Sequence, residues 1–290
     1  MSAKLPRAVS GERFELPGLN VYTAGVGPPL LLLHSVNAAA SAAEVRPVFE
    51  QFKDACTVYA PDLPGYGYSD RSDRAYTPRL MTDAIHTVVQ EIRRRHGTTP
   101  IDAMGLSLSC EFLARAADER PAEYRSLALV SPTGFSGRKA WRGPPGSTRA
   151  MPWLHQAFTG PGWGGALFRQ LTKPGVVRYF LRRTFGREEI DEQLWAYCVA
   201  TTREPGAEHA PLHFLAGSLF SADISDVYER LKLPVWMVHG VRGDFTDYRG
   251  ASRLKGRNHW RITALQTGAL PYFEVPSAFC NEYAAFLRSA

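Results

Sequence analysis

Gly105-Leu106-Ser107-Leu108-Ser109 is the stretch that decides how this chain folds. It follows the apolar residues 100–104, which suit a strand, and it opens a helix expected over residues 108–117. A strand that turns at once into a helix needs small residues two positions before and after the serine, and Gly105 and Ser109 meet that need. The turn would hold Ser107 out alone, in unfavourable backbone angles. The stretch therefore predicts an exposed serine hydroxyl between a strand and a helix.

Apolar runs on either side of this turn predict a sheet. The unbroken leucine run 30–33 suits a strand that is buried on both faces. Further strands are expected at residues 13–16, 20–23, 57–60, 127–130, 235–238 and 260–265, and helices at 81–95 and 276–288. Strands that alternate with helices predict an α/β fold with a mostly parallel, doubly wound sheet.

The alternation stops between residues 131 and 234. This interval is rich in Trp, Phe, Pro and Gly, looks helical and is too long for a loop in a compact domain. We expect a core domain in two parts, residues 1–135 and 227–290, with an inserted helical cap at 136–226. The many aromatic residues of the cap suit its own small core and a mostly apolar ligand pocket.

Three further motifs lie at predicted strand ends. They are His34-Ser35-Val36-Asn37, Asp62-Leu63-Pro64-Gly65-Tyr66-Gly67-Tyr68-Ser69-Asp70, and Val238-His239-Gly240 followed by Gly243-Asp244. Together with the serine turn they resemble the α/β-hydrolase superfamily, over nearly all of the chain outside the cap. The resemblance implies that Ser107 is the nucleophile and Asp244 the acid of its triad, with Asp247 as second candidate. It also implies an oxyanion hole formed by the backbone N–H groups of Leu108 and of Val36 or Ser35.

The sequence departs from that family at the general base. The family has Gly-His-x-Pro-x-x-Glu after its last strand, and Gly268, Pro271 and Glu274 fall in register with it. The histidine position is occupied by Ala269. A serine hydroxyl without an adjacent base is a weak nucleophile near neutral pH, so the catalytic triad is incomplete.

Four hypotheses remain open at this point. The base comes from another histidine, with His34, His209 and His213 as candidates and His239 after them, although each also suits a purely structural role. Alternatively, Ser107 acts without an imidazole in a lyase-like or isomerase-like reaction. The third hypothesis is that the chain is a ligand-binding pseudoenzyme. The fourth is that Ala269 is an introduced, inactivating replacement.

The serine turn at residues 105–109, the motif that begins at Asp62 and Asp244 occur together. Their joint presence favours an active enzyme over a protein that has lost its activity. We expect a serine hydrolase-like enzyme, a carboxylic ester hydrolase or acyl transferase. Its substrate would be an ester, thioester or other carbonyl of a small apolar molecule.

Composition narrows the remaining classes. The net charge of +6 is mild and no long Lys/Arg run occurs, so no nucleic-acid partner is expected. We find no apolar stretch of signal-peptide or membrane-spanning length, and we expect a cytoplasmic protein. The four cysteines show no CxxC spacing and should be reduced. No metal or cofactor motif is visible, and the oligomeric state is not indicated.

Overall fold

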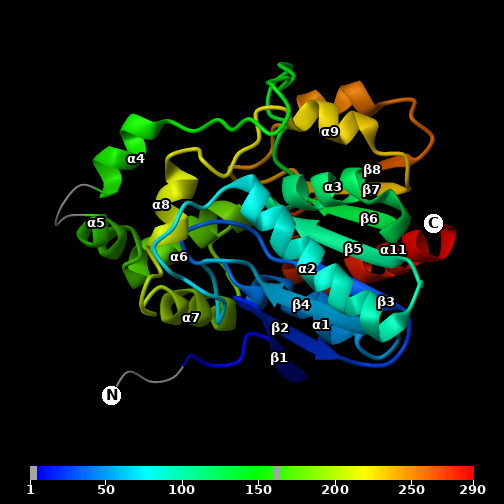
Figure 1. The fold of residues 1–290 in the computed structure, drawn as a ribbon, viewed down its shortest axis with the longest axis horizontal. Coiled ribbons are helices and arrows are strands. Elements are labelled where there is room, and N and C mark those ends of the chain that lie inside the picture. Colours follow the sequence, from blue (N-terminus) through cyan, green and yellow to red (C-terminus); the bar gives the residue numbers. More distant parts are fainter. Residues whose placement is uncertain (1–4, 160–163) are drawn as a thin grey trace.

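One eight-stranded sheet forms the centre of the molecule. The computed structural model describes residues 5–159 and 164–290. The strand order is β1-β2-β4-β3-β5-β6-β7-β8, with β2 antiparallel to both of its neighbours and the remaining pairs parallel (Figure 1). The strands are β1 (Glu12–Leu16), β2 (Leu19–Ala24), β3 (Pro29–Leu33), β4 (Thr57–Asp62), β5 (Ile101–Leu106), β6 (Tyr124–Val130), β7 (Val235–Gly240) and β8 (Trp260–Leu265). This arrangement confirms the predicted mostly parallel α/β sheet.

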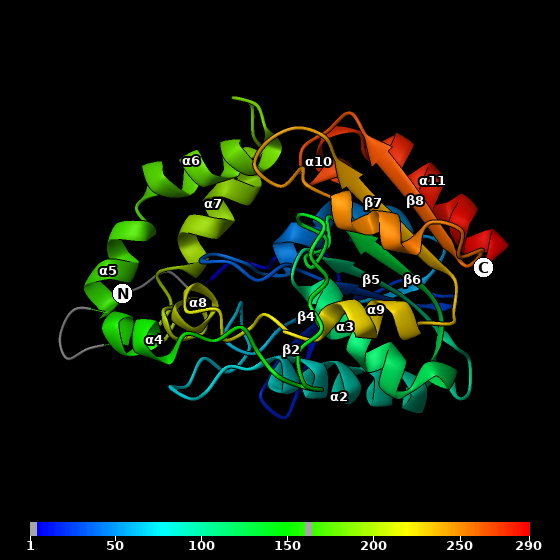
Figure 2. The ribbon, with the colours of Figure 1, turned by 90° about the horizontal axis from the view of Figure 1, so that it is seen from above.

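Helices cover both faces of the sheet. The α-helices are α1 (Arg46–Phe52), α2 (Pro78–His96), α3 (Ser109–Glu119), α4 (Pro152–Thr159), α5 (Gly164–Leu171), α6 (Pro174–Phe185), α7 (Glu192–Thr201), α8 (His209–Leu215), α9 (Ile224–Arg230), α10 (Pro271–Glu274) and α11 (Pro276–Ser289). Short 3-10 helices are η1 (Ala42–Val45), η2 (Pro121–Glu123) and η3 (Arg249–Leu254). Figure 2 shows α2, α3 and α9 on one face and α10 and α11 on the other.

The leucine run in β3 explains why the sheet is buried on both sides. Leu31 and Leu33 belong to the apolar core on the α2–α3 face, whereas Leu30 and Leu32 belong to the core on the α1–α11 face. All four side chains are buried, because successive side chains of a strand point to opposite faces. The prediction of a central strand at 30–33 is confirmed.

Helix α2 begins and ends where its local sequence dictates. Thr77 accepts a hydrogen bond from the backbone N–H of Leu80, and Pro78 occupies the first helical position. Gly97 ends the helix with a φ of 67°, in the left-handed region that favours glycine. The predicted helix at 81–95 is therefore confirmed and extends by about one turn at its start.

We call residues 136–226 the cap segment. Helices α4 to α8 lie beyond the carboxyl ends of the parallel strands, and α9 lies beside α3 (Figure 2). The described part of the cap segment contacts the core through α8, where a Cβ on Gly65 would meet Cβ of Ala210 at 2.3 Å. Within the described residues no helix is long and apolar enough to cross a membrane.

Candidate active site

Ser107 lies on a strained turn between β5 and α3. Its φ is 55°, which is uncommon for a residue other than glycine and costs roughly 1–3 kcal/mol. Its backbone N–H donates to the carbonyl oxygen of Val130 at 2.8 Å, which fixes the turn against β6. Gly105 relieves crowding at this turn, because a Cβ there would come within 3.2 Å of the Cys110 backbone. Ser107 is partly exposed between buried neighbours, and no described side chain is hydrogen-bonded to its hydroxyl.

The segment after β3 lies next to this turn. Leu33 pairs with Gly105 in the parallel register, so residues 35–36 run alongside Ser107 and Leu108. The hydroxyl of Ser109 donates to the carbonyl oxygen of His34 and joins the two segments directly. A glycine, which the family motif has at this position, would lack that bond.

The backbone donors predicted for an oxyanion hole are not equivalent. Ser35 N–H donates to Oε2 of Glu44 at 2.8 Å, so the structure removes Ser35 from that role. The N–H groups of Val36 and Leu108 have no hydrogen-bond partner within the described residues. Unused N–H groups on adjacent segments are the kind of donor that an oxyanion hole requires.

His34 has no ring nitrogen to spare for a proton. Its Nε2 accepts the backbone N–H of Leu63 at 2.9 Å, so Nδ1 carries the proton and donates to the carbonyl oxygen of Ser35. The side chain is buried, which lowers its pKa to about 4. His34 therefore serves as a structural link in this structure and is not a base for Ser107.

The other candidate histidines contact residues other than Ser107. His209 lies 3.5 Å from Asp73, and His213 packs against Tyr76 and His155 from α8, with burial lowering its pKa to about 4. His239 stacks on Tyr248 with ring centroids 3.9 Å apart. None of these side chains is hydrogen-bonded to Ser107 in the structure.

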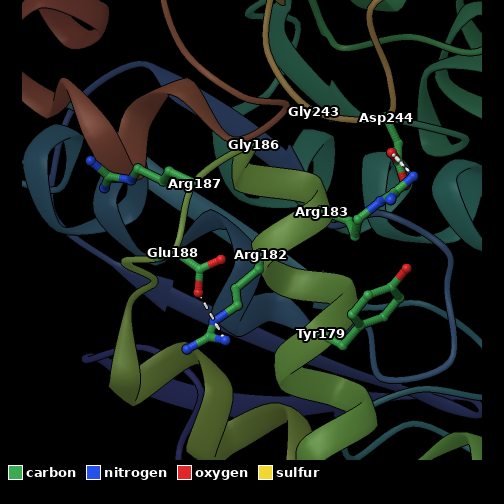
Figure 3. A pocket seen from close by; sticks show the side chains of 8 residues that line it. All are labelled: Tyr179, Arg182, Arg183, Gly186, Arg187, Glu188, Gly243 and Asp244. Carbon is green, nitrogen blue, oxygen red and sulfur yellow. Dashed lines mark hydrogen bonds and ion pairs between the residues drawn. The ribbon is translucent and has the colours of Figure 1, made fainter.

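The acid candidates point to other partners. Asp244 is exposed and forms an ion pair with Arg183 of α6, through Nε at 2.8 Å and Nη2 at 2.5 Å. Figure 3 shows these two side chains in contact with one another in the lining of a pocket of about 460 Å³ between α6 and the loop after β7. Asp247 accepts the backbone N–H of Gly137 and pairs with Arg249.

Ala269 is held by the cap segment. Its N–H donates to the carbonyl oxygen of Thr184 at 2.9 Å, and its own carbonyl oxygen accepts the hydroxyl of Ser131. A Cβ on Gly268 would meet the carbonyl oxygen of Phe185 at 2.4 Å, so the last turn of α6 sits directly on this loop. The loop that carries the base in the related family is here bound to a cap helix.

Sequence analysis missed three residues around this site. Glu44 and Glu111 are buried carboxylates, and burial raises the pKa of Glu111 to about 7. Ser131, at the end of β6, has a φ of 47° and, like Ser107, is one of the two described non-glycine residues with positive φ. Only Glu44 had a sequence signal, as a lone charge directly after the small-residue run 38–43.

Fold and turn together define a class of protein: a doubly wound α/β protein with a serine on the strained turn between β5 and α3. The chain matches the model of the alpha/beta hydrolase family over residues 30–282. It belongs to that family.

Curated relatives match a smaller part of the chain. Pimeloyl-[acyl-carrier protein] methyl ester esterase of Xylella fastidiosa (strain M12) is 28% identical over 121 residues, which cover 42% of this chain and 43% of that protein. The 2-hydroxymuconate semialdehyde hydrolase of Pseudomonas sp. (strain CF600) is 28% identical over 119 residues, 40% of this chain and 41% of that protein. The aligned region thus spans less than half the length of these relatives.

Solved structures resemble the whole chain. The epoxide hydrolase CorEH superposes with a TM-score of 0.72 at 20% identity, covering 97% of this chain and 99% of that one. A serine hydrolase involved in carbazole degradation superposes with a TM-score of 0.70 at 14% identity, covering 94% and 95%. At these identities the likeness shows the fold alone.

Proposed function

We propose that this protein is an enzyme that uses Ser107 on an ester, thioester or other carbonyl of a small, largely apolar molecule. The observation that carries the proposal is the strained, partly exposed Ser107 beside two unused N–H donors, Val36 and Leu108. Strain of this kind persists only where surrounding structure enforces it and is typical of functional sites. The named activities of the curated relatives, a methyl ester esterase and a semialdehyde hydrolase, support a carbonyl substrate.

The reaction would proceed in two displacements. Oγ of Ser107 bonds to the carbonyl carbon, and the electron pair of the C=O bond moves to the oxygen, which accepts the N–H groups of Val36 and Leu108. The hydroxyl proton passes to water, because no hydrogen bond joins a histidine ring to Oγ among the described residues. The electron pair returns and expels an alkoxide or thiolate, and water then hydrolyses the acyl-serine to a carboxylic acid.

The leaving group should determine which substrates react fastest. An alkoxide must gain a proton as it leaves, whereas a thiolate, whose conjugate acid has a pKa of about 8.5, leaves without one. A site with no imidazole to donate that proton favours thioesters and activated aryl esters over alkyl esters. The proposal therefore predicts faster turnover of a short-chain thioester than of the matched alkyl ester.

Covalent labelling tests the nucleophile. A fluorophosphonate should label the wild type at Ser107 in mildly alkaline buffer, and Ser107→Ala should abolish the label. Ser131→Ala is the matched control, because Ser131 is also a positive-φ serine at a strand end but is buried. Failure of the wild type to react, or label on a peptide without Ser107, would contradict the proposal.

A non-hydrolytic enzyme or a ligand-binding pseudoenzyme is the second candidate. The observation that favours it is the engagement of both proton-relay positions by α6, Asp244 through Arg183 and Ala269 through Thr184. Under the binding form of this alternative, Ser107→Ala keeps ligand affinity and any turnover, because the hydroxyl does no chemistry. Loss of a measured turnover in that variant would exclude the binding form of the alternative.

A further inference from the structure

Glu44 is a buried carboxylate with no part in the reaction proposed above. It lies on η1, only 5% exposed, and burial raises its pKa. Its Oε2 accepts the backbone N–H of Ser35 at 2.8 Å, and its Oε1 accepts Nδ2 of Asn37 at 2.8 Å. A carboxylate is removed from water here only because both oxygens find donors, so the two bonds strongly constrain the segment they hold.

Further hydrogen bonds within the segment hold the side chains of Ser35 and Asn37. Asn37 also donates to Oγ of Ser35 at 2.8 Å, and its Oδ1 accepts the N–H of Ala39 at 2.7 Å. The carbonyl oxygen of Ser35 accepts Nδ1 of His34. The backbone N–H groups of Val36 and Asn37 have no hydrogen-bond partner among the described residues, and the β3–β5 register places Val36 beside Ser107.

We propose that Glu44 is a positioning residue, which fixes the turn of residues 35–37 so that the Val36 N–H is presented to the substrate carbonyl oxygen. The inference rests on the proposed function of Ser107. It assigns to Glu44 no contact with substrate: the carboxylate acts through the Ser35 peptide and the Asn37 side chain. Binding of an oxyanion depends steeply on the direction of its donors, so a small rotation of this turn weakens the site without unfolding the protein.

The negative charge of Glu44 has the opposite effect on the oxyanion: it destabilises it. A carboxylate near the oxyanion raises the energy of the second negative charge. In the structure that charge is offset by hydrogen bonds from the Ser35 peptide and the Asn37 amide. We therefore expect the geometric effect to exceed the repulsion, and the sign of the measured change separates the two.

Glu44→Gln is the informative single substitution. An amide has one acceptor oxygen and one NH₂ group, while the site presents two donors, Ser35 N–H and Asn37 Nδ2. One donor must then face another donor. Rotation of the Asn37 amide does not resolve this, because its Oδ1 is already used by Ala39 N–H.

The double variant Glu44→Gln/Asn37→Asp exchanges the positions of the carboxylate and the amide and keeps the net charge constant. The new carboxylate at position 37 accepts from the new amide at position 44 and from Ala39 N–H, and the amide oxygen at position 44 accepts Ser35 N–H. The hydroxyl of Ser35 reverses and donates to the carboxylate. The two substitutions together should restore the geometry of the turn, with the negative charge at position 37 in place of position 44.

The measurement is the second-order rate of fluorophosphonate labelling at Ser107, because the phosphoryl oxygen binds where the carbonyl oxygen would. Glu44→Gln should label about tenfold or more slowly than the wild type, and the double variant should recover most of that rate. Glu50→Gln is the matched control: Glu50 also accepts a backbone N–H, that of Ser10 at 2.9 Å, but lies on α1 at the surface. It should label at the wild-type rate.

Three outcomes would overturn the inference. They are an unchanged rate in Glu44→Gln with the fold intact by circular dichroism, a faster rate, or a double variant no better than the single one. If the wild type does not label at all, the proposed function fails, and hydrogen exchange of the Ser35 amide then tests the positioning by itself. Glu44→Gln should raise that exchange rate by roughly tenfold or more and Glu50→Gln should not, and equal exchange would again overturn the inference.

Discussion

The loops after β3 and β5 and the loops after β7 and β8 lie at the same edge of the sheet but are held by different parts of the molecule. In the first pair, Ser109 bonds to His34 and Ser35 bonds to Glu44, so the contacts are made by core residues. In the second pair, Ala269 bonds to Thr184 and Asp244 to Arg183, so the contacts are made by α6 of the cap segment. In the function proposed above, the half of the site that would hold a carbonyl oxygen is built into the core. The half that would relay protons is held by the cap segment.

Burial distinguishes the cap attachments on the two sides. Helix α3, which follows Ser107, contacts the base of the cap through the ion pair of Arg115 with Asp223, whose side chains are 11% and 5% exposed. The pair of Arg183 with Asp244 is 51% and 36% exposed. A buried charge that loses its partner is costly, whereas an exposed pair is screened by water, so the two attachments should differ strongly in energy.

The largest expected effect is at the buried attachment. Arg115→Ala leaves the carboxylate of Asp223 buried without its partner and should lower the free energy of unfolding by roughly 3–5 kcal/mol. Urea unfolding followed by circular dichroism measures it. The control is Arg230→Ala, which breaks a pair with Asp118 on the same helix where the arginine is 53% exposed. Equal losses in both variants would contradict the distinction between buried and exposed attachments.

The pH dependence of stability gives the next effect. The carboxylate of Glu111 accepts hydrogen bonds from Oγ1 of Thr133, just before the cap segment, and from the backbone N–H of Ser221, near its end. The positive charge of Arg149 also acts on it. Burial raises its pKa from 4.5 to about 7. An acid with a raised folded-state pKa stabilises the fold below its unfolded pKa, and that contribution is lost as the pH rises from about 4.5 through about 7.

Glu111→Gln removes this titration. The stability of the variant relative to the wild type should therefore increase by about 3 kcal/mol between pH 4.5 and pH 8, at about 1.4 kcal/mol per unit between the two pKa values. Urea unfolding at several pH values measures the difference. Glu91→Gln should show no such trend above pH 5, because the hydrogen bond from Arg94 lowers the pKa of Glu91 to about 2. A flat difference for Glu111→Gln would mean that its carboxyl group titrates normally.

Restoring the missing imidazole probes the cap-held half. Ala269→His alone should raise esterase activity little, because Asp244, the residue that would orient the ring, stays paired with Arg183. The double variant Ala269→His/Arg183→Ala should raise kcat/KM on p-nitrophenyl esters by about 100-fold, the lower end of the gain from general acid–base catalysis. Ala269→Asn/Arg183→Ala is the control of similar size without a proton acceptor. A full gain with Arg183 in place would show that the ion pair does not restrain Asp244.

Sequence patterns predicted the features that depend on neighbouring residues. The leucine run of β3, the turn at Gly105–Ser109 and the cap of α2 at Gly97 are each encoded within a few positions, and all were found as expected. The contacts that decide how the site works join distant residues. Arg183 and Asp244 are 61 positions apart, and neither carries a local signal of the other. The sequence places His34 at a strand end beside Ser107, which suits a base, but its partner, the peptide N–H of Leu63, lies 29 positions away.

The smallest effect is expected at the exposed ion pair itself. Asp244→Asn keeps the shape of the side chain and removes its charge, and a pair this exposed should contribute less than about 1 kcal/mol to stability, decreasing as salt is added. Because Asp244 is not joined to a histidine, the substitution should also leave the rate of Ser107 labelling unchanged. Urea unfolding at low and high ionic strength and the fluorophosphonate rate measure the two quantities. A labelling rate that falls tenfold or more would return Asp244 to the catalytic machinery, since loss of a triad acid reduces nucleophile reactivity far more than loss of a surface charge.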